Sequence, residues 1–302
     1  MFKGSKKYYF ILILLPVFLY ISLSVFSSVA TFRVSNEESS LNPLSVGLEF
    51  QEIKIISNNK TVSSWWIPND TDRTLLVLHG LRGQKGDELI LNFVKEFHKL
   101  GFSIIAIDFR NHGASSKGDF TFGLDEINDV YTTLDYYYES KGIKHVGIWG
   151  FSYGATTAIF SGQQYGQQDV KTEIVGIFSD TPYFSLTEMI SAQISRRTPL
   201  NLFMANLLKP GILIFTNLFY GFDFNAIEQN YIENSGINIP TIIIGCTGDK
   251  TVPLEQSQKV HKSLGENSTL IEFKNCRVHG EAFDSDPSRY LQEFEKHFID
   301  LF

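Results

Sequence analysis

The chain lacks the groups on which metal, nucleotide and nucleic-acid binding usually depend. No His/Cys group has metal-ligand spacing, and no P-loop or G-x-G-x-x-G motif opens a helix. The formal net charge is −7, and no basic cluster offers a surface to a phosphate backbone. We therefore expect no cofactor, no metal ion and no nucleic-acid partner.

Charge of either sign is missing from a long stretch near the N-terminus. None of the 25 residues from Tyr8 to Phe32 is charged, and a helix of this length exceeds the ~30 Å hydrocarbon core of a bilayer. The flanking charges are Lys3, Lys6 and Lys7 before this stretch and Arg33, Glu37 and Glu38 after it. The positive-inside rule then predicts a single-pass anchor in the cell membrane, with the N-terminus in the cytoplasm and the remaining chain outside.

A cleaved signal peptide is the alternative for this stretch. Ser28-Val29-Ala30 resembles a small-x-small cleavage site, which would release a secreted protein near Ala30. The apolar stretch is longer than the ~7–15 residues of a usual signal peptide, which favours an uncleaved anchor. We therefore expect an anchor at 1–34 and a polar linker at 35–46.

Residues 47–302 alternate between strand-like and helix-like segments and predict one α/β domain. The expected strands lie near 47–57, 61–67, 74–79, 103–108, 145–150, 174–179, 241–246 and 268–274. The expected helices lie near 86–99, 123–140, 153–165, 254–264 and 286–301. This alternation predicts a mostly parallel eight-stranded sheet covered by helices on both faces, with the functional site at the carboxyl ends of its strands.

One interval interrupts the alternation and predicts a helical cap at about 185–238. About sixty residues separate two of the strands there, which is too many for a single crossover. Lys209 is the only charge between Arg197 and Asp223, so the segment either packs against the core or forms an acyl-lined pocket facing the bilayer. A second membrane span is not expected, because Pro210-Gly211 divides the apolar run into pieces of about ten residues.

The strongest motif is Gly150-Phe151-Ser152-Tyr153-Gly154, a G-x-S-x-G sequence between a predicted strand and a predicted helix. In this context the motif is typical of a nucleophile elbow, a sharp turn that raises the serine hydroxyl above the sheet. The two glycines remove Cβ atoms that would collide with neighbouring backbone. Ser152 is therefore the expected catalytic nucleophile.

A serine nucleophile needs a histidine base and a carboxylate, which follow it in the chain after such an elbow. His279 is the expected base, because it lies in a loop after a strand, whereas His261 and His297 lie within predicted helices. Asp249 is the expected acid, in the Gly-Asp turn that follows the strand at 241–246. Asp180, after the preceding strand, is an alternative acid.

Two backbone N–H groups are expected to stabilise the oxyanion. One belongs to Tyr153, directly after the serine, and the other to Leu81, in the loop after the strand at 74–79. His79 opens this loop and is expected to be a structural hydrogen-bonding residue, because it precedes the serine.

These residues resemble the α/β-hydrolase superfamily, most closely its serine aminopeptidase and prolyl-oligopeptidase-like branch, which includes membrane-anchored bacterial hydrolases. The matching segments are His79-Gly80-Leu81, Asp108 to Ser115, Gly150 to Gly154, Ser179 to Pro182, Gly248-Asp249 with Val252-Pro253, and His279. One departure is Asn111, where relatives carry Gly. The resemblance implies the α/β-hydrolase fold and leaves the substrate open, because this branch includes esterases, lipases, thioesterases and peptidases.

The function expected from these features is a serine hydrolase that cleaves carboxylic esters of small-molecule or lipid-like acyl substrates. A serine peptidase is one alternative, which turnover of aminoacyl-arylamides would distinguish. A non-catalytic membrane protein that retains the fold is another, which failure to react with serine-directed probes would favour.

The two cysteines of the chain lie three residues before the expected acid and base, at the ends of neighbouring strands. A disulfide between Cys246 and Cys276 is possible outside the membrane, but it would need a geometry that adjacent parallel strands rarely offer. We therefore expect two buried free thiols.

Overall fold

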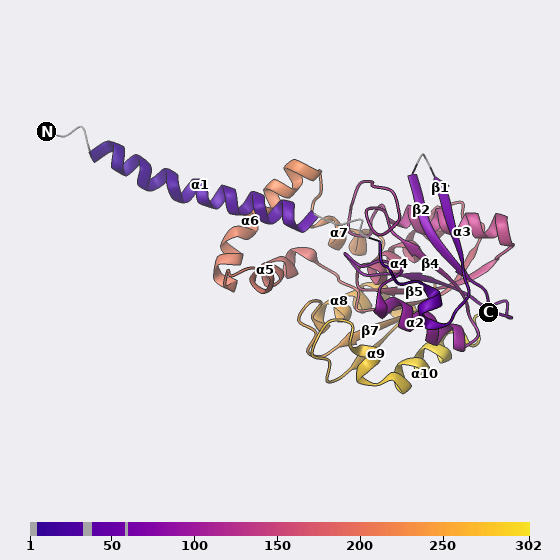
Figure 1. The fold of residues 1–302 in the computed structure, drawn as a ribbon. Coiled ribbons are helices and arrows are strands. Elements are labelled where there is room, and N and C mark those ends of the chain that lie inside the picture. The colour runs from indigo at the N-terminus through magenta and orange to yellow at the C-terminus, as the bar shows by residue number, and fades with distance from the viewer. Residues whose placement is uncertain (1–4, 33–37, 58–59) are drawn as a thin grey trace. The chain divides into compact units, whose positions relative to one another are not determined.

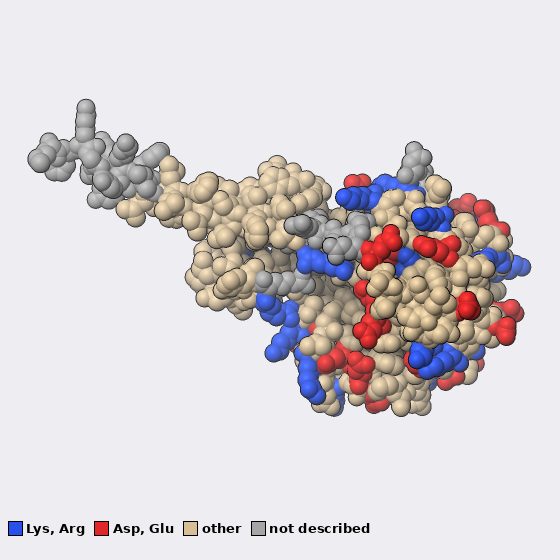
Figure 2. Space-filling model, in the orientation of Figure 1, with Lys and Arg blue, Asp and Glu red and all other residues tan. Residues whose placement is uncertain are grey.

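The computed structural model describes residues 5–32, 38–57 and 60–302, which form two compact units (Figure 1). Among the described residues, the smaller unit comprises 5–32 and 185–226, and the larger comprises 38–57, 60–184 and 227–302. The larger unit contains the whole β-sheet and all the residues expected to be catalytic. Both signs of charge are spread over the face of this unit seen in Figure 2.

The larger unit is built on one eight-stranded sheet with the strand order β1-β2-β4-β3-β5-β6-β7-β8. Its strands are β1 (Gln51–Ser57), β2 (Lys60–Ile67), β3 (Thr74–Leu78), β4 (Ser103–Asp108), β5 (His145–Phe151), β6 (Glu173–Asp180), β7 (Thr241–Cys246) and β8 (Ser268–Phe273). Strand β2 is antiparallel to β1 and β4, and the remaining pairs are parallel. The expected mostly parallel eight-stranded sheet is confirmed.

Helices cover both faces of this sheet. They are α2 (Glu88–Lys99), α3 (Ile127–Lys141), α4 (Tyr153–Gln164), α7 (Ala226–Glu233), α8 (Leu254–Leu264), α9 (Ala282–Ser285) and α10 (Pro287–Phe298). Short 3-10 helices lie at η1 (Pro43–Val46), η2 (Tyr165–Gln167) and η3 (Gly265–Asn267). Residues 43–46, expected as linker, pack against α2 through η1.

Local sequence explains where several of these helices begin and end. Helix α3 ends at Gly142, whose positive φ of 70° suits glycine. Helix α10 begins at Pro287, and the Asp286 side chain accepts a hydrogen bond from the Arg289 N–H at 3.1 Å. These signals place the ends of the helices close to the positions predicted from sequence.

The core on one face of the sheet is aromatic and joins α2 and α10 to the central strand β5. The ring centroids of Phe93 and Trp149 lie 4.4 Å apart, and those of Phe97 and Phe294 lie 4.1 Å apart. All four side chains are fully buried. Large buried aromatic pairs of this kind fix the central strand, and therefore the turn that follows it.

The smaller unit consists of α1 (Ser5–Phe32), α5 (Leu186–Arg197) and α6 (Leu202–Tyr220), of which α1 and α6 lie side by side (Figure 1). Lys3, Arg33 and Glu37, on which the expected membrane orientation depends, lie outside the described residues, as do the side chains of Lys6 and Lys7. The polar residues 35–37 of the expected linker also lie outside them.

The expectation that Pro210-Gly211 would divide the apolar run is wrong. Helix α6 continues through Pro210 for 19 residues, from its cap at Asn201 to Gly221. Proline removes a backbone donor and disturbs the preceding turn, but the Gly211 N–H finds an acceptor in the Tyr20 hydroxyl at 3.0 Å. Within the described residues, α6 is long and apolar enough to cross a membrane, and α1 contributes a shorter apolar stretch, Leu14–Ala30.

Candidate active site

Ser152 occupies the turn between β5 and α4, with a backbone conformation that few non-glycine residues adopt. Its φ is 54° and its ψ is −108°. The Ser152 N–H donates to the Asp180 carbonyl at 2.7 Å, and the Ser152 carbonyl accepts from the Thr156 N–H at 3.0 Å. The fold thus holds this residue in a strained geometry, as functional sites often do.

The glycines on either side of Ser152 are needed because backbone approaches backbone at the turn. A Cβ on Gly150 would collide with the Gly154 carbonyl and lie 2.8 Å from the Ala155 nitrogen. A Cβ on Gly154 would collide with the Leu78 carbonyl and lie 2.7 Å from the His79 carbonyl oxygen. Helix α4 can therefore begin directly against the end of β3.

Asp249 and His279 are brought together from loops thirty residues apart. The Asp249 Oδ2 lies 2.6 Å from the His279 Nδ1. The other oxygen, Oδ1, accepts the N–H groups of Thr251 and Val252 at 2.7 and 3.0 Å, which fixes the carboxylate. This acid is buried, while His279 keeps part of its ring in contact with solvent. The arrangement can orient an imidazole with its Nε2 free for proton transfer.

Phe151 links the three segments in which the site residues were predicted. Its ring lies 4.7 Å from the His279 ring, centroid to centroid. A Cβ on Gly280 would lie 3.1 Å from this ring, and a Cβ on Gly80 would lie 3.0 Å from it. The loops that carry His279 and Leu81 therefore meet at the residue directly before Ser152. Sequence reasoning did not assign Phe151 a role, although it is the variable position of the motif.

Two neutral histidines hold the loop that carries Leu81. The His79 Nε2 accepts the Phe109 N–H at 3.1 Å, so its Nδ1–H donates to the Gly80 carbonyl at 2.8 Å. Its pKa is lowered chiefly by complete burial, and the ring therefore acts as a structural hydrogen-bonding group.

His112 holds the same loop from its other side. Its Nε2 accepts the Arg82 N–H at 3.2 Å, and its Nδ1–H donates to the Arg110 carbonyl at 2.9 Å. Burial lowers the pKa of His112 to about 3, so the ring stays neutral at physiological pH. The peptide units on both sides of Leu81 are thus fixed. Asn111 has a φ of 66°, a left-handed conformation that asparagine tolerates better than most other non-glycine residues.

Tyr153 contributes to the site through its backbone, because its side chain lies in the core. The ring is fully buried and packs against Phe109 and Phe120, at centroid distances of 5.0 and 5.7 Å. Its N–H belongs to the first turn of α4, where backbone donors have no partner within the helix. This group and the loop of Leu81 are the candidates for an oxyanion hole.

Asp180, the alternative acid, makes a different contact. Its Oδ2 accepts the Tyr290 hydroxyl at 2.7 Å, and the Tyr290 oxygen accepts the Trp149 indole N–H at 2.9 Å. Complete burial raises the pKa of Asp180 to about 7. Of the two expected acids, Asp249 is the one hydrogen-bonded to His279, and Asp180 is bonded to Tyr290 instead.

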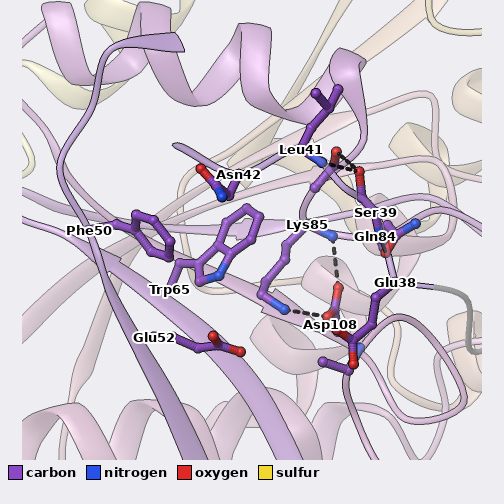
Figure 3. A pocket seen from close by; sticks show the side chains of 12 residues that line it. Glu38, Ser39, Leu41, Asn42, Phe50, Glu52, Trp65, Gln84, Lys85 and Asp108 are labelled. Carbon is purple, nitrogen blue, oxygen red and sulfur yellow. Dashed lines mark hydrogen bonds and ion pairs between the residues drawn. The ribbon is translucent and has the colours of Figure 1, made fainter. Parts of the chain in front are cut away.

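A polar cavity of about 140 Å³ is lined in part by Gln84, Lys85 and Gly86, in the loop that follows Leu81 (Figure 3). The Lys85 ammonium pairs there with Asp108, donates to the Ser63 hydroxyl at 2.9 Å and lies 4.8 Å from the Trp65 ring. The pair is buried, and it ties the loop to the end of β4. No signal in the sequence around Lys85 indicated this ion pair.

The expectation of two free thiols is wrong, because Cys246 and Cys276 form a disulfide. Their Cα atoms lie 6.0 Å apart, within the range that a disulfide spans. Cys276 lies beyond the end of β8, where the chain is no longer bound by strand geometry and can turn toward β7. The bond joins the base of the Asp249 loop to the base of the His279 loop.

No group of three or more His, Cys, Asp or Glu side chains is gathered closely enough to hold a metal ion in the part of the chain that the structure describes.

Comparison with known proteins gives matches to one kind of fold. Residues 73–189 match a family model described as the alpha/beta hydrolase fold. An uncharacterized protein of Bacillus subtilis, YqkD, is 32% identical over 98 residues, which are 30% of this chain and 30% of that protein. The chain thus matches under a third of the length of this relative.

Several solved structures share the fold at low sequence identity. The esterase Pf2001 of Pyrococcus furiosus is 22% identical, covering 89% of this chain and 99% of its own, with a TM-score of 0.69. Est1E of Butyrivibrio proteoclasticus, solved with ferulic acid, is 14% identical, covering 82% and 98%, with a TM-score of 0.58. A bacterial membrane phospholipase A is 13% identical, covering 96% and 94%, with a TM-score of 0.58.

Proposed function

We propose that the chain, whose residues 73–189 match the α/β-hydrolase fold, is a serine hydrolase that cleaves carboxylic esters of acyl or lipid-like substrates. The observation that carries the proposal is the hydrogen bond between Asp249 and His279. The His279 ring also lies against the ring of Phe151, the residue directly before Ser152. A buried acid, a partly exposed imidazole and a strained serine are the groups that acyl transfer requires.

In the first half of the reaction, the Ser152 Oγ attacks the ester carbonyl carbon while the His279 Nε2 takes the hydroxyl proton. Asp249 accepts the Nδ1–H and stabilises the imidazolium that forms. The N–H groups of Leu81 and Tyr153 bind the oxyanion. The alcohol leaves with the proton from His279, and the acyl group remains on Ser152.

In the second half, His279 takes a proton from water, and the resulting hydroxide attacks the acyl carbonyl. The carboxylic acid leaves, and the proton returns from His279 to the Ser152 oxygen. We favour esterase over peptidase activity because one similar solved structure is the esterase Pf2001, and another, Est1E, was solved with ferulic acid, a carboxylic acid.

We place the catalytic domain outside the cell membrane, anchored by α1. The lysines before the apolar stretch support this orientation. The Cys246–Cys276 disulfide supports it independently, since such bonds persist in oxidising compartments. One similar solved structure is a membrane phospholipase, which agrees with a lipid-like substrate.

The decisive test is Ser152→Ala in the full chain, purified in detergent. This variant should lose labelling by a fluorophosphonate probe and lose turnover of p-nitrophenyl esters by several powers of ten. Ser161→Ala is the matched control, because Ser161 lies on α4, is buried and donates to the Thr157 carbonyl at 2.8 Å. It should keep both activities. Full labelling of Ser152→Ala would rule out the proposed nucleophile, and preference for aminoacyl-arylamides over esters would favour a peptidase.

A further inference from the structure

Helices α1 and α6 pack with polar groups inward, which is unusual for helices surrounded by water. The hydroxyls of Ser28 and Thr216 hydrogen-bond at 2.7 Å, and both residues are fully buried. The Gly211 N–H donates to the Tyr20 hydroxyl at 3.0 Å. Hydroxyl pairs and a backbone donor satisfied by a neighbouring helix are typical of helix contacts in hydrocarbon.

Gly211 lets the two helices approach closely. A Cβ at this position would lie 2.8 Å from the Ser24 Cβ and 3.0 Å from the Tyr20 ring. Small residues allow such approach in membranes, where association depends on packing and interhelical hydrogen bonds. The polar contacts between α1 and α6 thus coincide with a small-residue interface.

Large apolar side chains point away from this interface. On α6 the exposed stripe consists of Phe203, Leu207, Ile214 and Leu218, whose spacing places them on one helix face. Phe203 is 75% exposed and Leu218 is 69% exposed. On α1, Leu12, Phe18 and Phe26 are each more than 60% exposed. Burying hydroxyls while exposing leucine and phenylalanine is favourable only if the surroundings are apolar.

Three polar side chains lie beside the apolar stripe of α6 and limit how the helix can lie. Asn206, Lys209 and Asn217 lie on one side of the stripe, among Leu202, Leu213 and Tyr220, and Lys209 is partly buried. The chain leaves the larger unit before α5 and re-enters it after α6, so a complete crossing by α6 alone would put its two ends on opposite sides of the membrane. A lysine and two asparagines on one side of an otherwise apolar helix can reach the headgroups while the exposed stripe contacts acyl chains.

We propose that α6 is embedded in the outer leaflet beside α1, with the stripe Phe203, Leu207, Ile214 and Leu218 in contact with lipid acyl chains. Asn206, Lys209 and Asn217 face the headgroups. This inference rests on the proposed anchoring of α1 in the membrane. It makes part of the cap a lipid-contacting element and suits an ester substrate that the bilayer presents.

The test places single fluorophores on the full chain reconstituted in vesicles of phosphatidylglycerol and brominated phosphatidylcholine. Ile214→Cys probes the apolar stripe and Asn217→Cys the polar side chains beside it. Phe18→Cys on α1 and Lys54→Cys on the sheet provide the lipid and water references. The unsubstituted chain, with its two cysteines in a disulfide, gives the labelling background.

Brominated lipid should quench the label at position 214 nearly as strongly as that at position 18, and aqueous iodide should reach positions 217 and 54 more readily. Quenching at 18 but not at 214 would overturn the proposal and leave the anchor intact. Lack of quenching at both would overturn the anchor and this proposal together. Turnover of a water-soluble ester by each variant confirms that it is folded.

Ile214→Lys provides a functional readout with Asn217→Lys as its control. The first should lower turnover of a vesicle-embedded ester several-fold and leave turnover of p-nitrophenyl acetate unchanged, because a lysine in the acyl region is unfavourable. The second should change neither. Equal turnover of the vesicle-embedded ester by both variants would contradict the proposed contact with acyl chains.

Discussion

Ser152 is held in its conformation by glycines that cannot be replaced without moving the backbone. The clash of a Gly154 Cβ with the carbonyls at the end of β3 would displace either the strand or the first turn of α4. The serine and the Tyr153 N–H would move with that turn. The strain at this single residue is thus sustained by close contact with its neighbours.

We predict that Gly154→Ala lowers the free energy of unfolding by about 3 kcal/mol or more and removes ester turnover. Gly166→Ala is the control, because nothing lies within 4 Å of its added Cβ. It should change stability by less than about 0.5 kcal/mol. Chemical denaturation and p-nitrophenyl ester assays measure both effects. A stable, active Gly154→Ala chain would contradict the close approach.

Asp180 should make the stability of the protein depend on pH. Its pKa rises from 3.8 to about 7 because burial disfavours the charged form. The folded state therefore binds more protons than the unfolded state between these values. The stability contributed by the neutral carboxyl is fully present below pH 3.8 and is lost as the pH rises through about 7.

Asp180→Asn should remove this dependence while keeping an acceptor for the Tyr290 hydroxyl. We expect its free energy of unfolding to fall less between pH 4 and pH 7 than that of the unchanged chain. Denaturation at a series of pH values measures the difference. Asp70→Asn, at an exposed position, should follow the unchanged chain. Identical slopes for Asp180→Asn and the unchanged chain would show that Asp180 is ionised when buried.

Among the structural elements, β7 and β8 carry the acid and base loops, and the disulfide joins those loops just below the site. Parallel pairing brings the carboxyl ends of both strands to the same edge of the sheet. The bond between Cys246 and Cys276 then limits how far the loops can separate. The disulfide therefore restrains the two loops that carry Asp249 and His279.

Replacing both cysteines by serine should lower the free energy of unfolding by roughly 3–4 kcal/mol, because the bond closes a loop of 30 residues. Turnover should also fall, since the two loops would be held less firmly. A thiol reductant should reproduce both effects in the unchanged chain and have no further effect on the double variant. Unchanged stability and turnover in the double variant would mean that the strands alone position the loops.

Element boundaries were largely predictable from sequence, and the exception is informative. All eight expected strands are present within a few residues of their predicted limits. Helix α6 was expected in two pieces, because Pro210 weakens a helix considered alone. In the structure the helix is continuous, and the Gly211 N–H donates to the hydroxyl of Tyr20, which lies on another helix. A local pattern cannot indicate a partner almost two hundred residues away.

For the molecule as a whole, the proposed orientation across the membrane depends on three lysines near the N-terminus. Changing Lys3, Lys6 and Lys7 to glutamine should lower the fraction of chains with the catalytic domain outside. A membrane-impermeant fluorophosphonate applied to intact cells measures that fraction, with permeabilised cells as the total.

The matched control changes three exposed lysines of the larger unit, Lys54, Lys144 and Lys262, and should leave the labelled fraction as it was. Labelling that requires permeabilisation in the unchanged chain would contradict the extracytoplasmic orientation. It would also remove the oxidising compartment as the explanation for the disulfide.

The order of strands and helices, the turn at Ser152 and the candidates Asp249 and His279 followed from sequence alone, because each is encoded in a short run of neighbouring residues. Tertiary structure decided the rest. The disulfide, the neutral state of His79 and His112, the bond of Asp180 to Tyr290 and the unbroken α6 each require groups from distant segments to meet. Burial and hydrogen bonding act only once those segments are packed, so no local pattern could reveal them.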